Sequence, residues 1–218
     1  MGPLDSVPFG TENAAMPKYK LTYFDFSGSR GEECRLAMFV AGVDFEDNRI
    51  SNETWQALKP TSPYGALPVL ETEGKPPLAQ SNAILAYVGR RYGLHPNDAW
   101  EAARHEAILV AVEELRAAIG PSARLTDPEA KKKAREELAN GYLQTWGRNL
   151  ERQITGPFVA GERIQVADIK LFQMVTAFKQ GVLDHIPSSV FGAFPKLEGV
   201  YEAVARHPKI VEWRARHS

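Results

Sequence analysis

The chain has 218 residues, of which 44% are hydrophobic and 24% charged, and its formal net charge is -1. This composition is typical of a water-soluble globular protein with one large domain or two modest ones. Since positive charge is not in excess, we expect no nucleic-acid partner, and since no apolar run reaches about 18 residues, we expect no membrane span.

The first 15 residues contain glycines and prolines and show no periodicity, and they lack the charged start and apolar centre of a secretory signal. We predict that residues 1–15 are a flexible extension or a vector-derived remnant, with the folded chain starting near Met16. Cys34 is the only cysteine, which excludes an intrachain disulfide and a multi-cysteine metal site. A reducing, cytoplasmic location is the natural expectation.

Short strand-like and helical patterns alternate in the first part of the chain. In order they predict a strand over 19–24, a helix over 32–42, a strand over 45–50, at most one helical turn over 55–58, a strand over 67–71, a turn over 73–75 and a helix from residue 81. Ser81 is a competent N-cap for that last helix. The order β-α-β, connector, β-β-α indicates a mixed α/β domain over residues 16–93.

After a linker at 93–97 the patterns are helical only. They predict helices over 100–119, 128–154, 168–182 and 195–205, with a helix boundary at His207-Pro208. Leu138, Tyr142, Trp146 and Leu150 recur every four residues and are expected on one buried face. Residues 98–218 are therefore predicted to form an all-helical domain.

Several local motifs occur together in a fixed order. They are Tyr19-Lys-Leu-Thr-Tyr23-Phe24, Arg30-Gly-Glu-Glu-Cys-Arg35, Trp55 with Lys59, Pro63-Tyr64-Gly65-Ala66-Leu67-Pro68-Val69-Leu70, Gln80-Ser81-Asn-Ala-Ile84-Leu-Ala-Tyr87 and Ala167-Asp168. In this combination the chain resembles the cytosolic glutathione S-transferases from about Pro17 to Trp213, most closely the tyrosine-dependent, sigma-like class. The resemblance implies a thioredoxin-like N-terminal domain that binds glutathione and a helical C-terminal domain that supplies the acceptor-substrate pocket.

Such an enzyme must convert the glutathione thiol, whose ordinary pKa is about 8.5, into a thiolate. Lowering that pKa by about two units takes roughly 2.7 kcal/mol of preferential stabilisation, and a phenol that donates to the sulfur supplies much of it. The resemblance places Tyr23 in this catalytic role, with Ser27 or Ser29 as the alternative and a core tyrosine as the plain structural reading. It also places Arg30 beside the thiolate. The alternative is that Arg30 is an ordinary cation on the surface.

The resemblance implies a further set of residues that contact glutathione. They are Trp55, Lys59, Leu67, Pro68, Gln80, Ser81 and Glu113. Trp55 and Lys59 are expected at the glycyl end, and a cis Leu67-Pro68 turn is expected to pair with the cysteinyl amide. Gln80-Ser81, at a helix start, suits the γ-glutamyl carboxylate.

The resemblance also extends to the neighbouring subunit. Glu113 stands, with Glu114 beside it, where relatives carry an aspartate that reaches the glutathione amine of the neighbouring subunit. An equal alternative is that both glutamates belong to an ordinary solvated helix face.

The chain departs from the family pattern at a few positions. Ala66 replaces a polar residue before the Leu-Pro turn, and Gln165 replaces a Ser or Thr cap, so Asp168 is read as structural. Pro121 stands where some prostaglandin isomerases of this class carry a tryptophan, which disfavours that activity. The acceptor pocket is expected beside the sulfur. Its predicted walls are Phe24, Phe26, Leu115 and Ile119.

The sequence therefore predicts a homodimeric enzyme that adds glutathione to small hydrophobic electrophiles. Tyr64 is a candidate for packing against the partner subunit, or a lone surface aromatic. The alternatives are a glutathione-dependent isomerase or peroxidase, and a non-catalytic structural or binding module of the same fold. Glutathione is the expected co-substrate, and no metal is expected because the five histidines lack ligand spacing. Cys34 is expected to be a small buried apolar residue.

Overall fold

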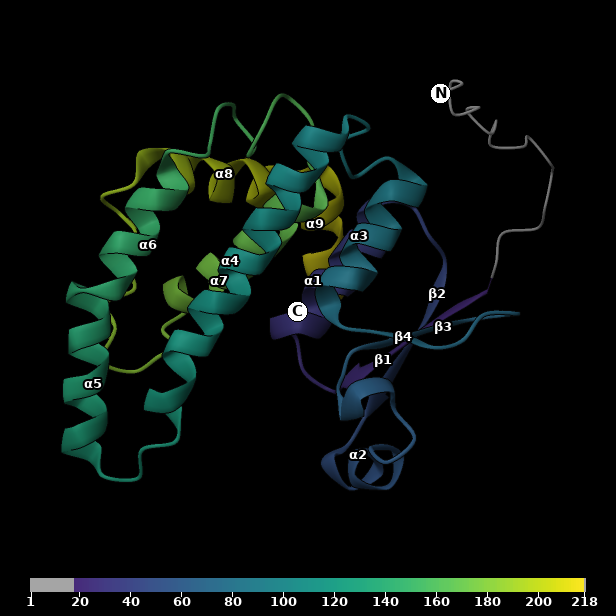
Figure 1. The fold of residues 1–218 in the computed structure, drawn as a ribbon, viewed down its shortest axis with the longest axis horizontal. Coiled ribbons are helices and arrows are strands. Elements are labelled where there is room, and N and C mark those ends of the chain that lie inside the picture. Colours follow the sequence, from purple (N-terminus) through teal and green to yellow (C-terminus); the bar gives the residue numbers. More distant parts are fainter. Residues whose placement is uncertain (1–17, 218) are drawn as a thin grey trace, which may run out of the picture.

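The computed structural model describes residues 18–217, so the predictions made for residues 1–15 and for Met16 lie outside the described part. The N-terminal half contains a four-stranded sheet and three α-helices (Figure 1). Its elements are β1 (Tyr19–Phe24), α1 (Ser29–Val40), β2 (Phe45–Ile50), α2 (Asn52–Leu58), the 3-10 turn η1 (Pro63–Gly65), β3 (Val69–Thr72), β4 (Leu78–Ala79) and α3 (Ser81–Tyr92).

The sheet has the strand order β2-β1-β3-β4, with β1 and β2 parallel and the other two pairs antiparallel. The α1 crossover between β1 and β2 makes parallel pairing possible, whereas β3 and β4 are joined by a tight turn. The prediction of a mixed α/β domain is therefore confirmed, and the arrangement is thioredoxin-like. The helix predicted as at most one turn over 55–58 is longer and begins at Asn52, because Ser51 caps α2 by accepting a hydrogen bond from the Thr54 N–H.

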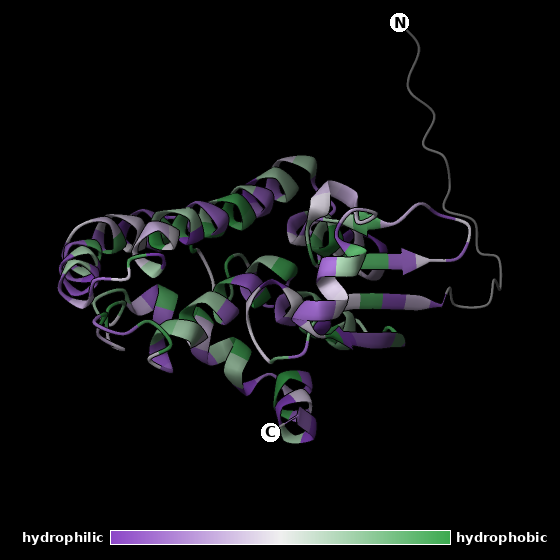
Figure 2. Ribbon diagram, turned by 90° about the horizontal axis from the view of Figure 1, so that it is seen from below, coloured by the Kyte–Doolittle hydropathy of each residue, from purple (hydrophilic) through white to green (hydrophobic). Residues whose placement is uncertain are grey.

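The C-terminal half is all-helical in the described chain. Its helices are α4 (Ala99–Ala123), α5 (Pro128–Asn140), α6 (Tyr142–Glu151), α7 (Val166–Lys179), α8 (Pro195–Arg206) and α9 (Pro208–His217). They lie beside the sheet half, and α1 and α3 lie between the sheet and these helices (Figure 1). Most helices alternate hydrophobic and hydrophilic residues along their length (Figure 2), as expected when one face packs inward. None of the helices within residues 18–217 has the length and apolarity needed to cross a bilayer.

Helix α7 is the centre of this half. It packs against α1, α3, α4 and α8, and nearly all of its residues are buried. At its start, the Asp168 carboxylate accepts the Gln165 N–H at 2.7 Å and the Val159 N–H at 2.6 Å. Asp168 therefore holds the preceding loop on the helix, which agrees with the structural role expected for it.

One helix prediction was wrong, and another was confirmed but incomplete. The helix expected over 128–154 is broken at Gly141, whose φ of -113° and ψ of -91° lie outside the helical region. The break turns α6 relative to α5, so that Leu143 is fully buried whereas Tyr142, expected on the buried face, is exposed. The predicted boundary at His207-Pro208 is confirmed, but Pro208 also begins α9, which the sequence pattern did not reveal.

Candidate functional site

The strand register brings several predicted site residues to one edge of the sheet. Val69 begins β3, where it pairs with the residue before Tyr23 in β1 and with the residue before Gln80 in β4. Continuing the alignment by one position brings Pro68 beside both Tyr23 and Gln80. The parallel strand β2 also ends at this edge, so α2 starts there. Residues far apart in the sequence therefore meet where β1 ends.

The turn before β3 and the start of α3 have the special geometry that was expected. The Leu67-Pro68 peptide bond is cis, as predicted. Ser81, however, is not the N-cap: Gln80 holds that place, with a φ of 74° and no side-chain capping bond. Ser81 is the first helical residue and is buried, because its hydroxyl turns inward and accepts a hydrogen bond from Lys170 at 3.4 Å.

Tyr23 lies in an aromatic cluster at the end of β1. Its ring centroid is 5.5 Å from that of Phe24 and 5.6 Å from that of Phe26, and only 6% of the residue is exposed. The first turn of α1 crosses directly over the ring at Gly31, where an added Cβ would be 2.0 Å from a ring carbon. The ring position therefore depends on glycine at residue 31.

Arg35, which sequence reasoning passed over, fixes the chain that follows Tyr23. Its fully buried guanidinium donates to the carbonyls of Phe24, at 3.2 Å, and Phe26, at 2.9 Å, and to the Asp47 carboxylate, at 2.8 Å. Because Arg35 lies on α1 and Asp47 on β2, the loop after β1 is tied to two elements. The sequence signal was an arginine within an apolar helical pattern.

The two residues expected at the glycyl end differ in environment. Trp55 of α2 is 8% exposed, and its ring lies 6.3 Å from that of Phe24 in an edge-on arrangement. Lys59, directly after α2, is exposed. Trp55 thus joins the aromatic cluster around Tyr23, while Lys59 reaches solvent at the same end of the sheet.

Arg30 and Glu113 are brought together, although the sequence suggested separate roles. The Arg30 Nη2 donates to the Glu113 carboxylate at 2.6 Å, and Arg116 and Lys170 each donate to the same carboxylate at 2.6 Å. Burial by itself raises the pKa of Glu113, but the charge and hydrogen bond of Lys170, with Arg116 and Arg30, lower it to about 2. Glu113 is therefore only partly exposed, and its carboxylate is held by three cations of its own chain.

Lys170 and Glu33 complete this ionic cluster, and neither was predicted. Both are fully buried and lie 2.6 Å apart, and Arg116 donates to Glu33 at 2.9 Å. The available signal was a charged residue flanked by apolar ones, Lys170 between Ile169 and Leu171. Such a position needs an internal partner, and the sequence does not reveal which one.

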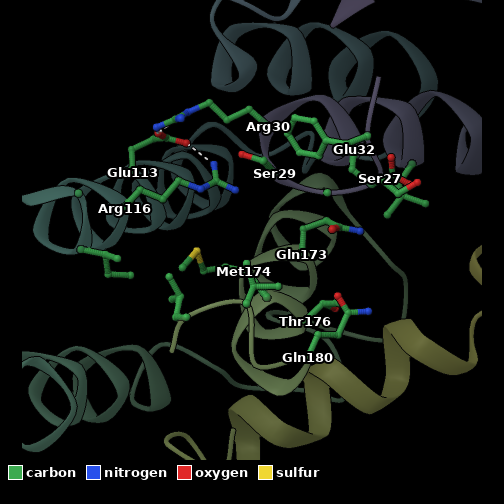
Figure 3. A pocket seen from close by; sticks show the side chains of 18 of the residues that line it. Ser27, Ser29, Arg30, Glu32, Glu113, Arg116, Gln173, Met174, Thr176 and Gln180 are labelled. Atoms are coloured by element: carbon green, nitrogen blue, oxygen red, sulfur yellow. Dashed lines mark hydrogen bonds and ion pairs between the residues drawn. The ribbon is translucent and has the colours of Figure 1, made fainter. Parts of the chain in front are cut away.

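A cavity of about 1270 Å³ lies between the first turn of α1 and helices α4, α7 and α9. Figure 3 shows its polar and charged side chains, with Arg30 and Arg116 turned toward Glu113. Its walls include the following residues: Phe26, Ser27, Ser29, Arg30, Glu113, Ile119, Pro121, Arg124, Gln173, Met174, Gln180, Trp213 and Arg214. The contributions of α7 and α9 were missed because no motif links those helices to the site.

Of the four residues predicted as walls of the acceptor pocket, two lie at this cavity, and their role stays a prediction. Phe26 and Ile119 line the cavity, whereas Phe24 and Leu115 do not. Leu115 is fully buried, because it lies on the face of α4 that packs into the core. Phe24 lies instead between Tyr23 and Trp55.

Cys34 is fully buried in α1. Its burial is the main cause that raises the pKa of its thiol, and the negative charge of Glu33 raises it further. A buried, protonated thiol is unreactive, which fits its reading as a small core residue. Within residues 18–217, His, Cys, Asp and Glu side chains form no group of three that is able to hold a metal ion.

Comparisons with known proteins match both halves of the chain. Residues 19–90 match the family model of the glutathione S-transferase N-terminal domain, and residues 113–217 match a model of the C-terminal domain. Glutathione S-transferase 1 of Ascaris suum is 34% identical over 206 residues, covering 92% of this chain and 97% of that protein.

The chain belongs to the glutathione S-transferase family.

Solved structures of relatives have the same fold. The glutathione S-transferase of Ascaris lumbricoides is 34% identical with a TM-score of 0.82, covering 93% of this chain and 98% of that one. Prostaglandin synthase D of Nilaparvata lugens is 31% identical with a TM-score of 0.81, covering 93% of this chain and 99% of that one. Na-GST-3 of Necator americanus, described as monomeric, is 28% identical with a TM-score of 0.75, covering 92% of this chain and 98% of that one. These names do not assign a class, so the sigma-like placement of this transferase remains a prediction.

The close approach of α1 to Tyr23 gives a direct test of the site geometry. Changing Gly31→Ala should push the Tyr23 ring aside, lower the free energy of unfolding by about 1–3 kcal/mol, as overpacking does, and lower glutathione-dependent turnover. Urea unfolding and turnover of 1-chloro-2,4-dinitrobenzene measure the two effects.

The matched control is Gly199→Ala in α8, where an added Cβ has nothing within 4 Å. It should leave turnover unchanged and raise stability by roughly 0.5–1 kcal/mol. Equal stability and turnover in both variants would contradict the contact between α1 and Tyr23.

Proposed function

We propose that this transferase activates the glutathione thiol with the hydroxyl of Tyr23 and transfers the thiolate to small hydrophobic electrophiles. The position of Tyr23 carries the proposal: it lies at the edge of the sheet where the cis Leu67-Pro68 turn and the start of α3 meet. A phenol that donates to a thiolate in a site shielded by Phe24 and Phe26 stabilises the anion more strongly than water does.

Glutathione itself is anchored, in this proposal, along the same edge. The backbone of Leu67 pairs with the cysteinyl amide, and Gln80 and Ser81 bind the γ-glutamyl carboxylate at the positive end of α3. Trp55 and Lys59 bind the glycyl end, Lys59 through its exposed ammonium. The support is geometric, since all these residues lie around the end of β1.

The acceptor electrophile is proposed to enter the cavity between the two halves. Arg30, on its wall, carries a cation close to the end of β1 and helps orient the thiolate, although its guanidinium is shared with Glu113. Phe26, Ile119 and Met174 supply apolar walls for a hydrophobic acceptor. A serine alternative stays open, because Ser27 and Ser29 also line this cavity.

The protein is proposed to act as a cytoplasmic homodimer. Tyr64 is 82% exposed and Trp100, at the start of α4, is 75% exposed, and large exposed aromatic side chains are typical of subunit interfaces. Glu113 is the carboxylate proposed to reach a neighbouring glutathione, and the exposed Glu114 is the alternative, because Glu113 is already engaged within its own subunit. The single cysteine, fully buried as a free thiol, suits a reducing cytoplasm.

Tyr23→Phe tests the thiol activation. Removing the hydroxyl proposed to donate to the sulfur should lower turnover of 1-chloro-2,4-dinitrobenzene by about 10²-fold, as loss of one oxyanion donor does. The phenyl ring keeps the aromatic packing, so the free energy of unfolding should change little. Steady-state kinetics at saturating glutathione give the comparison.

Ser27→Ala and Ser29→Ala are the matched variants in the same loop. Each should retain most of the wild-type turnover. If Tyr23→Phe keeps most of its turnover and one serine variant loses it, the serine takes the activating role.

The dimer is tested by light scattering at micromolar protein concentration. The wild type should have about twice the mass of the 24.2 kDa chain, and Tyr64→Ala should shift it toward the monomer, because a packing side chain is lost. Lys75→Ala, at an exposed residue of the β3–β4 turn, is the control and should remain dimeric. A monomeric wild type would contradict the dimer.

A further inference from the structure

The buried Lys170 ammonium of α7 contacts three groups, which are contributed by α1, α4 and α3. It contacts Glu33 and Glu113, each at 2.6 Å, and the hydroxyl of Ser81 at 3.4 Å. An ammonium group has three N–H donors and no acceptor, so these three contacts use all of its protons. Lys170 is fully buried, which fixes it in this place.

This arrangement determines how the Ser81 hydroxyl bonds. Because Lys170 only donates, the Ser81 oxygen accepts from it, and the single proton of the hydroxyl points elsewhere. Ser81 stands at the first residue of α3, where the first backbone N–H groups of a helix have no partner within the helix. The hydroxyl and these N–H groups are therefore all donors.

The charges of the cluster do not cancel. Lys170, Arg116 and Arg30 supply three positive charges, and Glu33 and Glu113 supply two negative ones. The cluster therefore has a net charge of one positive, and its Lys170 ammonium lies 3.4 Å from the Ser81 hydroxyl at the start of α3, where the helix dipole is also positive. Both the donors and the charge at this place favour a bound carboxylate.

We infer that Lys170 is a positioning residue for the γ-glutamyl carboxylate of glutathione. It holds the Ser81 hydroxyl as a donor to that carboxylate, while Glu33 and Glu113 hold its ammonium. The inference rests on the proposed function, because it takes the start of α3 as the glutathione subsite. Lys170 touches neither the thiol nor the acceptor, so it affects binding and not the chemical step.

A buried pair is removed most cleanly by changing both partners. Removing one partner leaves a charge buried without compensation, whereas replacing both by apolar residues of similar volume is often neutral for stability. The variant Glu33→Leu/Lys170→Met also leaves the net charge of the cluster unchanged. Lys179→Met/Glu198→Leu, which removes another ion pair anchored on α7, is the matched control.

The test compares two ligands by isothermal titration calorimetry. One is glutathione, and the other is γ-aminobutyryl-Cys-Gly, the same tripeptide without the α-carboxylate of its first residue. In Glu33→Leu/Lys170→Met the affinity for glutathione should fall about tenfold, the size of one hydrogen bond to a charged group, and that for the second ligand less than twofold. In steady-state kinetics the KM for glutathione should rise by a similar factor, with kcat at saturating glutathione within twofold.

A second variant tests whether the effect passes through Ser81. Ser81→Ala alone should lower the affinity for glutathione to a similar extent. Adding Glu33→Leu/Lys170→Met to it should lower that affinity little further, because both changes remove one shared interaction. The control pair on α7 and α8 should bind both ligands as the wild type does. Urea unfolding of each variant confirms that it is folded.

Each outcome separates the possibilities. If the wild type binds no glutathione, the proposed function itself fails. If the wild type binds glutathione and the Glu33/Lys170 variant keeps its affinity and its preference for glutathione, the positioning role is overturned and the proposed function stands. If that variant loses both ligands equally, Lys170 has a structural role only.

Discussion

The constraint on which the site depends is the buried ion pair between Glu33 of α1 and Lys170 of α7. Burying two such charges costs several kcal/mol per ion, and only close geometry with further hydrogen bonds offsets that cost. Both side chains are fully buried at 2.6 Å, and Arg116 and Glu113 of α4 satisfy their remaining bonds. The spacing of α1, α4 and α7 is therefore fixed where the two halves meet.

That junction also positions the residues proposed to carry out the chemistry. Helix α1 carries Glu33 on the face toward α7, and its first turn carries Gly31 against the Tyr23 ring. The same helix carries Arg35, which binds the carbonyls after β1. One helix thus positions the proposed catalytic tyrosine, one wall of the cavity proposed for the acceptor, and the ionic cluster that contacts Ser81 at the start of α3. A shift of α1 would disturb all three together.

Local sequence patterns were sufficient for β1 and β2, because alternation is a local property, whereas the cis Leu67-Pro68 turn was predicted from the resemblance to the family. They failed at Gly141, since a four-residue apolar spacing does not reveal a glycine that leaves the helical conformation and breaks the helix. Leu115, which was predicted from the resemblance as a pocket wall, is buried in the core and does not line this cavity, because α4 has apolar residues on more than one face and only packing decides which face is covered.

The ionic cluster was the least predictable part of the site. The sequence presented Arg30 and Glu113 as separate candidates, 83 residues apart, and only the packing of α1 on α4 joins them. Lys170 was visible as a charge in an apolar helix, but its partner Glu33 is 137 residues away. Motif resemblance therefore named candidate residues at the edge of the sheet, and Arg30 and Glu113 in the cluster, but missed Glu33, Arg116 and Lys170.

The most direct test of the central claim is the pKa of the glutathione thiol when bound to the wild-type protein. Ultraviolet difference spectra of the thiolate, recorded while the pH of the complex is raised, give this value against free glutathione in the same buffer. The account predicts a thiol pKa about two units below the ordinary value of about 8.5. A bound thiol that titrates like the free one would show that the protein binds glutathione without activating it, and would contradict the account.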